Sequence, residues 1–172
     1  MARIVPPPLG RNFVVGFVFD EAKSHVLLIE KNRPKWQAGR LNGIGGKIGL
    51  EEHPESAMSR EFCEEADVYW TDWTHFAVVS GTDWQFDHTG LTVARIFFYT
   101  ASSDSVYKRA KSVTDEPLVR LPLRDLWEMS SRLIPNLPVL IPLALSTEFQ
   151  RPINLEWSPE TIEIKKSQLG ES

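Results

Sequence analysis

The chain has 172 residues, of which 42% are hydrophobic and 24% are charged, a composition typical of one soluble globular domain. Its 19 Lys and Arg residues and 23 Asp and Glu residues give a net charge of −4, which argues against a general nucleic-acid or membrane-surface binder, because such proteins need a basic face. No apolar run approaches the roughly 20 residues that cross a bilayer.

The single cysteine, Cys63, cannot form an internal disulfide, so a reducing cytoplasm is the expected location. We expect one domain over residues 1–172. Residues 1–10 are rich in proline and lack the apolar stretch of a signal peptide, so we expect a flexible N-terminal segment there.

The first half of the chain predicts a hairpin, a loop and a helix. Apolar and β-branched residues indicate strands over 13–19 and 25–30, joined by a turn at 22–24. The glycine-rich stretch 32–46 indicates a loop. A helix is predicted over 54–66, with proline at its first position. Its apolar stripe recurs every four residues, at Met58, Phe62 and Ala66.

The second half predicts mainly strands. Those over 73–80 and 91–100 surround a polar turn at 87–90, and a short strand is expected over 118–121. Residues 134–146 are apolar and predicted to be helical, although three prolines leave the start of that helix open.

A terminal hairpin is predicted from two alternating segments, 153–157 and 161–165, around the turn at 158–160. Strands interleaved with helices in this way indicate an α/β or α+β domain.

Three carboxylates project from one side of the helix over 54–66. Glu61 and Glu65 are one turn apart, and Glu64 is three residues from Glu61. Like charges at this spacing cost a helix about 0.2–0.5 kcal/mol per pair. The simplest interpretation is a solvated acidic face; the alternative is a site for a hard cation, since Mg²⁺ prefers carboxylate oxygens together with water and phosphate.

The residues before the helix decide between these interpretations. Gly46 is followed after five residues by Glu52, and after seven more by Arg60 and Glu61. The segment 46–68 closely resembles the Nudix box, G-x5-E-x7-R-E-U-x-E-E-x-G-U, in which U is a bulky apolar residue. Eight positions match: Gly46, Glu52, Arg60, Glu61, Phe62, Glu64, Glu65 and Val68.

One position departs from the box, because the family's second glycine is Asp67 here. That glycine follows the end of the helix, where a left-handed residue often closes the turn. Aspartate adopts this conformation at a cost of about 1 kcal/mol. We therefore expect a modest loss of stability and no loss of chemistry, because Asp67 is not at a metal-ligand position.

The sequence does not match other common nucleotide-binding and catalytic motifs. A P-loop ending at Gly46 and Lys47 would need glycine at Leu41 and a hydroxyl residue at Ile48. A Rossmann glycine pattern that starts at Gly43 also breaks at Ile48. The sequence contains no nucleophile elbow, and its four histidines are too scattered for a zinc cluster.

The similarity extends beyond the box. Residues 39–47 look like the segment that enters the box in the oxidised-purine nucleotide sanitising (8-oxo-dGTP diphosphatase-like) members of the family. The order of residues 114–117, Leu126 and Trp127 is also similar. The fold that this resemblance implies is an α/β/α sandwich around a mixed sheet, with a C-terminal β-hairpin.

The resemblance also implies one or more Mg²⁺ ions, for which Mn²⁺ can substitute. The implied ligands are Glu61, Glu64, Glu65, Glu116 and the backbone carbonyl of Gly45. Glu116 would meet the metals as a ligand or as the general base. Arg60 and Glu52 would orient the carboxylates. Lys47 would help neutralise the substrate phosphates.

The implied reaction is hydrolysis of a diphosphate linkage, a cleavage of an acid anhydride. Water made acidic by Mg²⁺ would attack one phosphorus atom while a carboxylate takes its proton. Which of Glu64, Glu65 and Glu116 accepts the proton stays open. A nucleoside triphosphate would give the monophosphate and pyrophosphate.

Fewer residues indicate the substrate than indicate the reaction. Asn42 matches an asparagine that reads the base in sanitising members, and Trp36 and Trp127 match aromatic positions near the base. Trp36 could equally be a loop aromatic that covers the core. The acidic pair that recognises oxidised purine in similar members is replaced by Met129 and Ser130, so oxidised purine is a candidate base and not an assigned one.

The resemblance and the residues leave three alternative functions. The preferred one is a (deoxy)nucleoside triphosphate pyrophosphatase with a small-molecule nucleotide as its partner, and without a membrane or a stable nucleic-acid partner. The second is a hydrolase of nucleoside diphosphate derivatives, such as ADP-ribose or a dinucleoside polyphosphate. The third is a non-catalytic Nudix-fold binding module, which would usually have lost box carboxylates. Trp84 and Phe86 are expected on a loop, where they either contact the substrate or pack against the protein. The sequence leaves the oligomeric state open.

Overall fold

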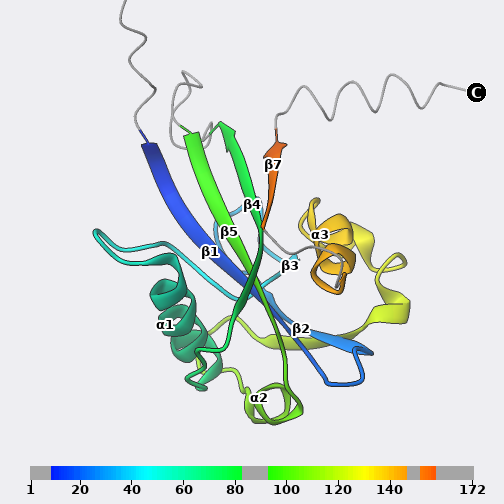
Figure 1. The fold of residues 1–172 in the computed structure, drawn as a ribbon. Helices are drawn as coiled ribbons and strands as arrows, with labels where there is room; N and C mark the ends of the chain where they lie inside the picture. The colour runs from blue at the N-terminus through cyan, green and yellow to red at the C-terminus, as the bar shows by residue number, and fades with distance from the viewer. Residues whose placement is uncertain (1–8, 83–92, 147–151, 158–172) are drawn as a thin grey trace, which may run out of the picture.

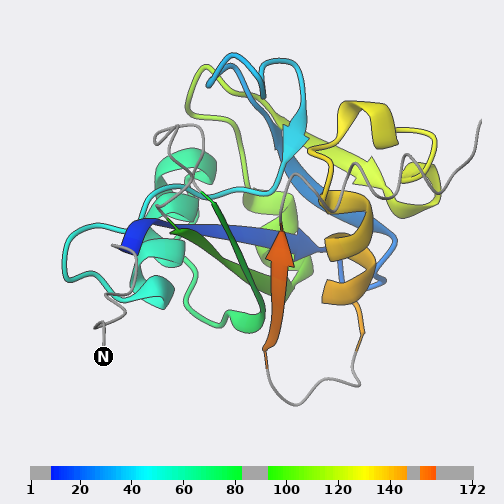
Figure 2. The ribbon, with the colours of Figure 1, turned by 90° about the horizontal axis from the view of Figure 1, so that it is seen from above.

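The computed structural model describes residues 9–82, 93–146 and 152–157. A seven-stranded mixed sheet has helices on both faces (Figures 1 and 2). The strand order is β3-β2-β1-β5-β4-β7, and β6 also pairs with β2. The strands are β1 (Leu9–Phe19), β2 (His25–Glu30), β3 (Leu41–Asn42), β4 (Thr74–Thr82), β5 (Val93–Ser102), β6 (Leu118–Pro122) and β7 (Ile153–Trp157). The helices are α1 (Pro54–Ala66), α2 (Asp104–Arg109) and α3 (Leu137–Ala144), with 3-10 turns at Leu123–Asp125 and Ser130–Arg132.

The two faces of the sheet bury separate apolar clusters, so the expected three-layer architecture is confirmed. One cluster lies under α1 and α2 and includes Met58, Phe62 and Tyr107. The other lies under α3 and includes Leu137 and Leu140. Because neighbouring residues of a strand point to opposite faces, β1 contributes to both clusters.

Helix α1 has the bounds that the sequence predicts. Pro54 occupies its first turn, and its apolar stripe is fully buried, with the ring of Phe62 meeting that of Trp73 edge-on at 5.3 Å. Asp67 ends the helix in the left-handed conformation, at φ 55°, and its N–H donates to the carbonyl of Cys63. The predicted turn is therefore present with aspartate in the place of glycine.

Several predicted elements differ from the observed ones. β1 begins at Leu9, inside the segment expected to be flexible, because Leu9 is in register with Val93 of β5. α3 begins at Leu137 and not at 134, because the N–H of Ile134 donates to the carbonyl of Leu41 instead of starting a helix. The short elements β3 and α2 were not predicted.

The predicted terminal hairpin is only partly described. Its first segment forms β7, which pairs in parallel with β4, so Val79 is opposite Leu155. Its second segment, 161–165, and the turns at 87–90 and 158–160 lie outside the described residues, as do residues 1–8. Within the described residues, no helix is both long and apolar enough to span a membrane.

The loop that enters the box is hydrogen-bonded to β1. β1 pairs with β2 only through Val18 and Phe19. Further towards the N-terminus of β1, Gly16 exchanges backbone hydrogen bonds of 2.7 and 3.1 Å with Ile44, and the N–H of Val14 donates to the carbonyl of Gly46 at 2.9 Å. This pairing holds the loop in front of α1 and fixes the backbone that faces the carboxylates.

Candidate active site

The C-terminal half of α1 presents the three predicted carboxylates, but in different surroundings. Glu61 and Glu65 are mostly buried, whereas the Glu64 side chain is 58% exposed. Glu61 lies against the loop: a Cβ atom added to Gly46 would be 2.5 Å from its Oε2. Glycine at position 46 therefore leaves room for the carboxylate to approach the backbone.

Arg60 connects four parts of the box. Its guanidinium donates to both oxygens of Glu52, at 2.8 and 2.9 Å, and to Glu61 at 2.8 Å. It also donates to Glu64 at 3.2 Å and to the backbone carbonyl of Lys47 at 3.1 Å. These bonds raise the pKa of Arg60 and offset the repulsion between the carboxylates of the helix.

Glu52 holds Arg60 in place from the loop side. Its Oε2 also accepts from the N–H of Gly49 at 2.7 Å. The hydrogen bond from Arg60, followed by that from Gly49, lowers the pKa of Glu52 to about 2. Arg60 thus links Glu52 to Glu61 and Glu64, the two carboxylates that it contacts in the helix, and the orienting role of Arg60 and Glu52 stays a prediction.

Glu65 points into the loop. Its Oε2 accepts from the N–H of Gly45 at 3.1 Å. Burial raises the pKa of Glu65 to about 7, and the neighbouring carboxylates of Glu61 and Glu116 add to that effect. A Cβ on Gly45 would collide with the backbone of Val14, so this close packing of loop, strand and carboxylate requires glycine there.

Glu116 reaches the same place from the other end of the chain. It lies two residues before β6, and it is only 4% exposed. Its Oε1 accepts from the backbone N–H groups of Asn32 at 2.7 Å and Arg33 at 3.3 Å, and its Oε2 accepts from Lys31 Nζ. Burial alone would raise the pKa of Glu116, but the bonds from Lys31 and Asn32 outweigh it and leave the pKa below its usual value.

Lys31 is the important residue that sequence reasoning missed. It follows β2, and its Nζ lies 3.9 Å from Oε1 of Glu65 while it is bonded to Glu116. The ammonium group thus joins a carboxylate of α1 to the distant one. The pair is 85 residues apart in sequence, so no local pattern could reveal it; the signal was a lysine that ends a buried strand beside the box.

The donor set fits a divalent cation such as Mg²⁺ in its chemistry. Glu61 and Glu65 lie against the backbone of the glycine loop, and Lys31 joins Glu65 to Glu116. Hard cations prefer such carboxylate oxygens. In the described part of the chain, however, no three His, Cys, Asp or Glu side chains are arranged to hold one metal ion. The reason is that Arg60 engages Glu61 and Glu64, and Lys31 engages Glu116. Metal binding would exchange some of these ion pairs for metal ligation.

The residues predicted to bind the base come from β3 and from turns outside the box. Asn42 is in β3, where its Oδ1 accepts from the N–H of Gly43 and its Nδ2 donates to Gln37 at 3.3 Å. Trp36 is 46% exposed and Trp127 is 67% exposed. Among the described residues, neither tryptophan ring has an aromatic partner.

The two residues that replace the acidic pair contribute to the packing and to a turn before α3. Met129 packs against the apolar cluster under α3, and Ser130 begins a 3-10 turn. Lys47 is exposed, and its carbonyl accepts from Arg60. Trp84 and Phe86 lie outside the described residues.

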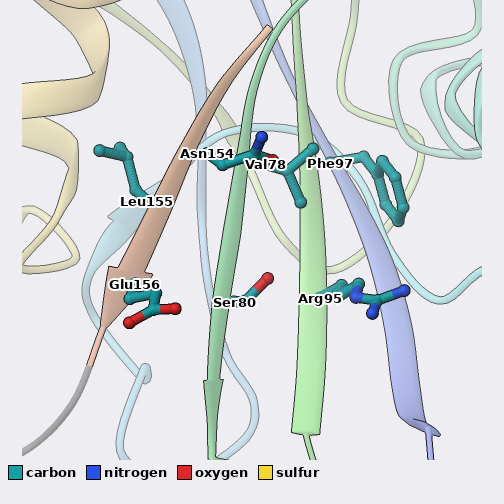
Figure 3. Close-up of a pocket in the computed structure, with 7 residues that line it drawn as sticks. All are labelled: Val78, Ser80, Arg95, Phe97, Asn154, Leu155 and Glu156. Atoms are coloured by element: carbon teal, nitrogen blue, oxygen red, sulfur yellow. The ribbon is translucent and has the colours of Figure 1, made fainter.

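A surface hollow of about 370 Å³ lies away from these residues, on the face of β4, β5 and β7 (Figure 3). Two cross-strand rows line it, Asn154–Val78–Phe97 and Glu156–Ser80–Arg95, and Leu155 completes the lining. None of the predicted site residues belongs to it.

Comparisons with known proteins identify the family and support the fold. The model of the NUDIX domain family matches residues 10–128. No curated protein sequence matches the chain. Among solved structures, the MutT protein from Bacillus halodurans superposes with a TM-score of 0.62 at 16% identity, over 88% of this chain and 92% of that one.

Two structures of NrtR from Shewanella oneidensis are also similar, each with a TM-score of 0.56. The NUDIX domain complexed with ADP ribose is 21% identical, over 77% of this chain and 84% of that one. NrtR complexed with a 27mer DNA is 22% identical, over 77% of this chain and 59% of that one. At these identities the structural likeness supports the fold, while the family match covers more than half of the chain. The chain belongs to the NUDIX domain family.

Proposed function

We propose that the protein is a Mg²⁺-dependent (deoxy)nucleoside triphosphate pyrophosphatase that releases the nucleoside monophosphate and pyrophosphate. The observation that carries this proposal is that Glu65 and Glu61 lie against Gly45 and Gly46, while Lys31 joins Glu65 to Glu116. These carboxylates come from two distant segments, and their mutual repulsion is unfavourable unless cations are present. Such an arrangement suits a site that binds metal and phosphate.

In this proposal the residues of the chain have separate tasks. Glu61, Glu64, Glu65 and Glu116, with the carbonyl of Gly45, would hold Mg²⁺. The bound ion would supply a more acidic water and neutralise charge on the phosphates. Arg60 keeps Glu61 and Glu64 aligned through its bonds to Glu52. One of Glu64, Glu65 and Glu116 takes the proton of the attacking water.

The exposed cation Lys47 lies beside the glycine loop and is suited to the charge that builds on the phosphoryl oxygens. For the base we propose Asn42, Trp36 and Trp127 as contacts. Exposed tryptophans can stack on a purine, and each such stack is worth about 1–3 kcal/mol. Oxidised guanine is the candidate base, since the glycine loop and Asn42 resemble the sanitising members.

A nucleoside diphosphate derivative is the second candidate substrate. The observation that favours it is the likeness to the NrtR domain, which was crystallised with ADP ribose. A binding module without activity is less well supported, because every box carboxylate is present. The same likeness to NrtR, which was also crystallised with DNA, is why the expected lack of a nucleic-acid partner stays a prediction.

The test is chromatographic analysis of the products formed with Mg²⁺ from dGTP, 8-oxo-dGTP, ADP-ribose and a dinucleoside tetraphosphate. The last two substrates would release neither phosphate nor pyrophosphate, so their nucleotide and sugar-phosphate products are measured. We expect pyrophosphate from the triphosphates, with 8-oxo-dGTP turned over fastest. Turnover of ADP-ribose alone would replace the preferred substrate with the second candidate. No turnover of any nucleotide, with the protein folded, would favour the binding module.

A further inference from the structure

Lys31 occupies the position where a cation would join α1 to Glu116. Its side chain is 15% exposed, and its Nζ is bonded to Glu116 Oε2 and lies 3.9 Å from Glu65 Oε1. The backbone of Lys31 is fixed as well, since its N–H donates to Arg40 and its carbonyl accepts from Gly39, at 2.9 and 2.8 Å. The hydrogen bonds to residues 39 and 40 close the loop that follows Lys31, and the fixed backbone holds the ammonium group near the carboxylates.

Glu116 has little remaining capacity for a metal ion while Lys31 is in this place. Its Oε1 already accepts from two backbone N–H groups, and its Oε2 accepts from Lys31. A divalent cation that uses Glu116 must therefore take Oε2. At that position the cation and the ammonium group would repel each other in surroundings that screen charge poorly.

We propose that Lys31 is an internal competitor for the divalent cation at Glu65 and Glu116, so that ligation by Glu116 requires the ammonium group to leave. This inference rests on the proposed metal-binding role of the carboxylates. It makes Lys31 a positioning residue that sets the affinity and the number of bound metal ions. In the structure the same residue supplies the counter-charge of the buried Glu116 carboxylate.

The test is metal binding without nucleotide. Mn²⁺ titrations followed by electron paramagnetic resonance, and Mg²⁺ titrations followed by calorimetry, give the dissociation constant and the stoichiometry. In Lys31→Met, which removes the charge and keeps the length of the side chain, we expect binding to tighten about 10-fold, which corresponds to about 1.4 kcal/mol. Lys31→Arg should bind like the wild type because it keeps the charge.

Two further variants isolate the effect. Lys35→Met removes an exposed cation from the same loop and should leave the dissociation constant within about 2-fold of the wild-type value, because Coulomb interactions between exposed charges are weak in water. Adding Glu116→Gln to Lys31→Met should abolish the gain. If Lys31→Met is too unstable without metal, Lys31→Gln is measured in its place, since its amide can still donate to Glu116.

Binding by Lys31→Met or Lys31→Gln that is equal to or weaker than wild type, with Glu65→Gln still reducing it, would overturn the role of Lys31 and leave the metal site standing. Equal tightening by Lys35→Met would also overturn it, because the effect would then be one of net charge. Absence of binding in every variant would instead remove the proposed function and this inference with it.

Discussion

Two regions of the surface that carry the proposed function differ in how they are held. In the box region, charged groups are linked to one another within the protein: Arg60 alone contacts three carboxylates and one carbonyl. In the base region, Trp36 and Trp127 are exposed and Asn42 has a single side-chain partner, Gln37. The box is thus ordered by its own contacts, while the base region offers surface that a ligand could cover.

The difference follows from what each region has to recognise. Phosphate chemistry is the same for all nucleotides, and charge must be placed accurately, so a fixed network of ion pairs is useful. A base is recognised through flat apolar surface and a few polar groups, which need only be available. Substitutions should therefore separate the two regions by the kind of effect they have.

The largest effect is expected from Glu65→Gln. The change removes a charge at the metal-facing end of α1 but keeps the shape, so turnover should fall by about 10²- to 10⁴-fold. The measurement is kcat by pyrophosphate release, together with the melting temperature. The control is Glu128→Gln, which removes an exposed carboxylate outside the box. Activity within a few-fold of wild type would contradict the assignment of Glu65.

Glu52→Gln should lower the stability of the box region. Loss of the ion pair with Arg60 should cost about 1–2 kcal/mol near neutral pH, since the pair is partly exposed. The pKa of Glu52 is lowered in the folded state, from 4.5 to about 2, so its contribution is present above 4.5 and lost as the pH falls towards 2.

Urea unfolding of the wild type and Glu52→Gln at several pH values measures this contribution. The difference between their free energies of unfolding should shrink as the pH falls below 4.5. Glu51→Gln, an exposed neighbour with the same charge change, is the control. A difference that is independent of pH would show that the ion pair with Arg60 is not its source.

Trp127→Ala should affect the base region alone. The side chain is 67% exposed, so the free energy of unfolding should change by no more than about 0.5 kcal/mol. Loss of one stacking contact should raise KM roughly 10-fold with kcat nearly unchanged. Tyr69→Ala, which removes another exposed aromatic side chain, is the control. If kcat falls and KM stays constant, Trp127 acts on the chemistry and the separation of the two regions fails.

The smallest effect is expected from Asp67→Gly. Glycine relieves a left-handed aspartate, at a gain of about 1 kcal/mol. It also removes the exposed ion pair between Asp67 and Lys111, which contributes less than that because solvent screens it. The net gain should be about 0.5 kcal/mol, or a rise of about 1–2 °C in melting temperature. Asp67→Ala should shift the melting temperature in the opposite direction, and activity should stay constant in both variants. A fall in melting temperature for Asp67→Gly would mean that the ion pair outweighs the backbone cost.

The sequence predicted what depends on local pattern or on fixed spacing. β2 and α1 have the expected bounds, because an apolar run and a stripe repeated every four residues are complete within each segment. The left-handed Asp67 was also expected from its place after the helix. The box carboxylates were found by their spacing, without any knowledge of the fold.

What the sequence could not show depends on contacts between distant segments. The six-residue helix α2 is too short for a periodic signal, and its helical start is set by Ser103, whose hydroxyl accepts from the N–H of Val106. The parallel pairing of β7 with β4 joins segments more than 70 residues apart. Lys31 was missed for the same reason, since its partners Glu65 and Glu116 come from elsewhere in the chain.

The pairing of residues 44–48 with β1 has a further consequence. The amides of Ile44 and Ile48 donate to Gly16 and Asn12, as the amides of a sheet strand would. The hydrogens of such amides exchange with deuterated solvent only when the sheet around them opens. Their exchange is therefore slow. The backbone of residues 44–48 should therefore lose its conformational freedom when the protein folds. The loop backbone would then lose little further conformational entropy when a nucleotide binds, so its ordering would not weaken the affinity.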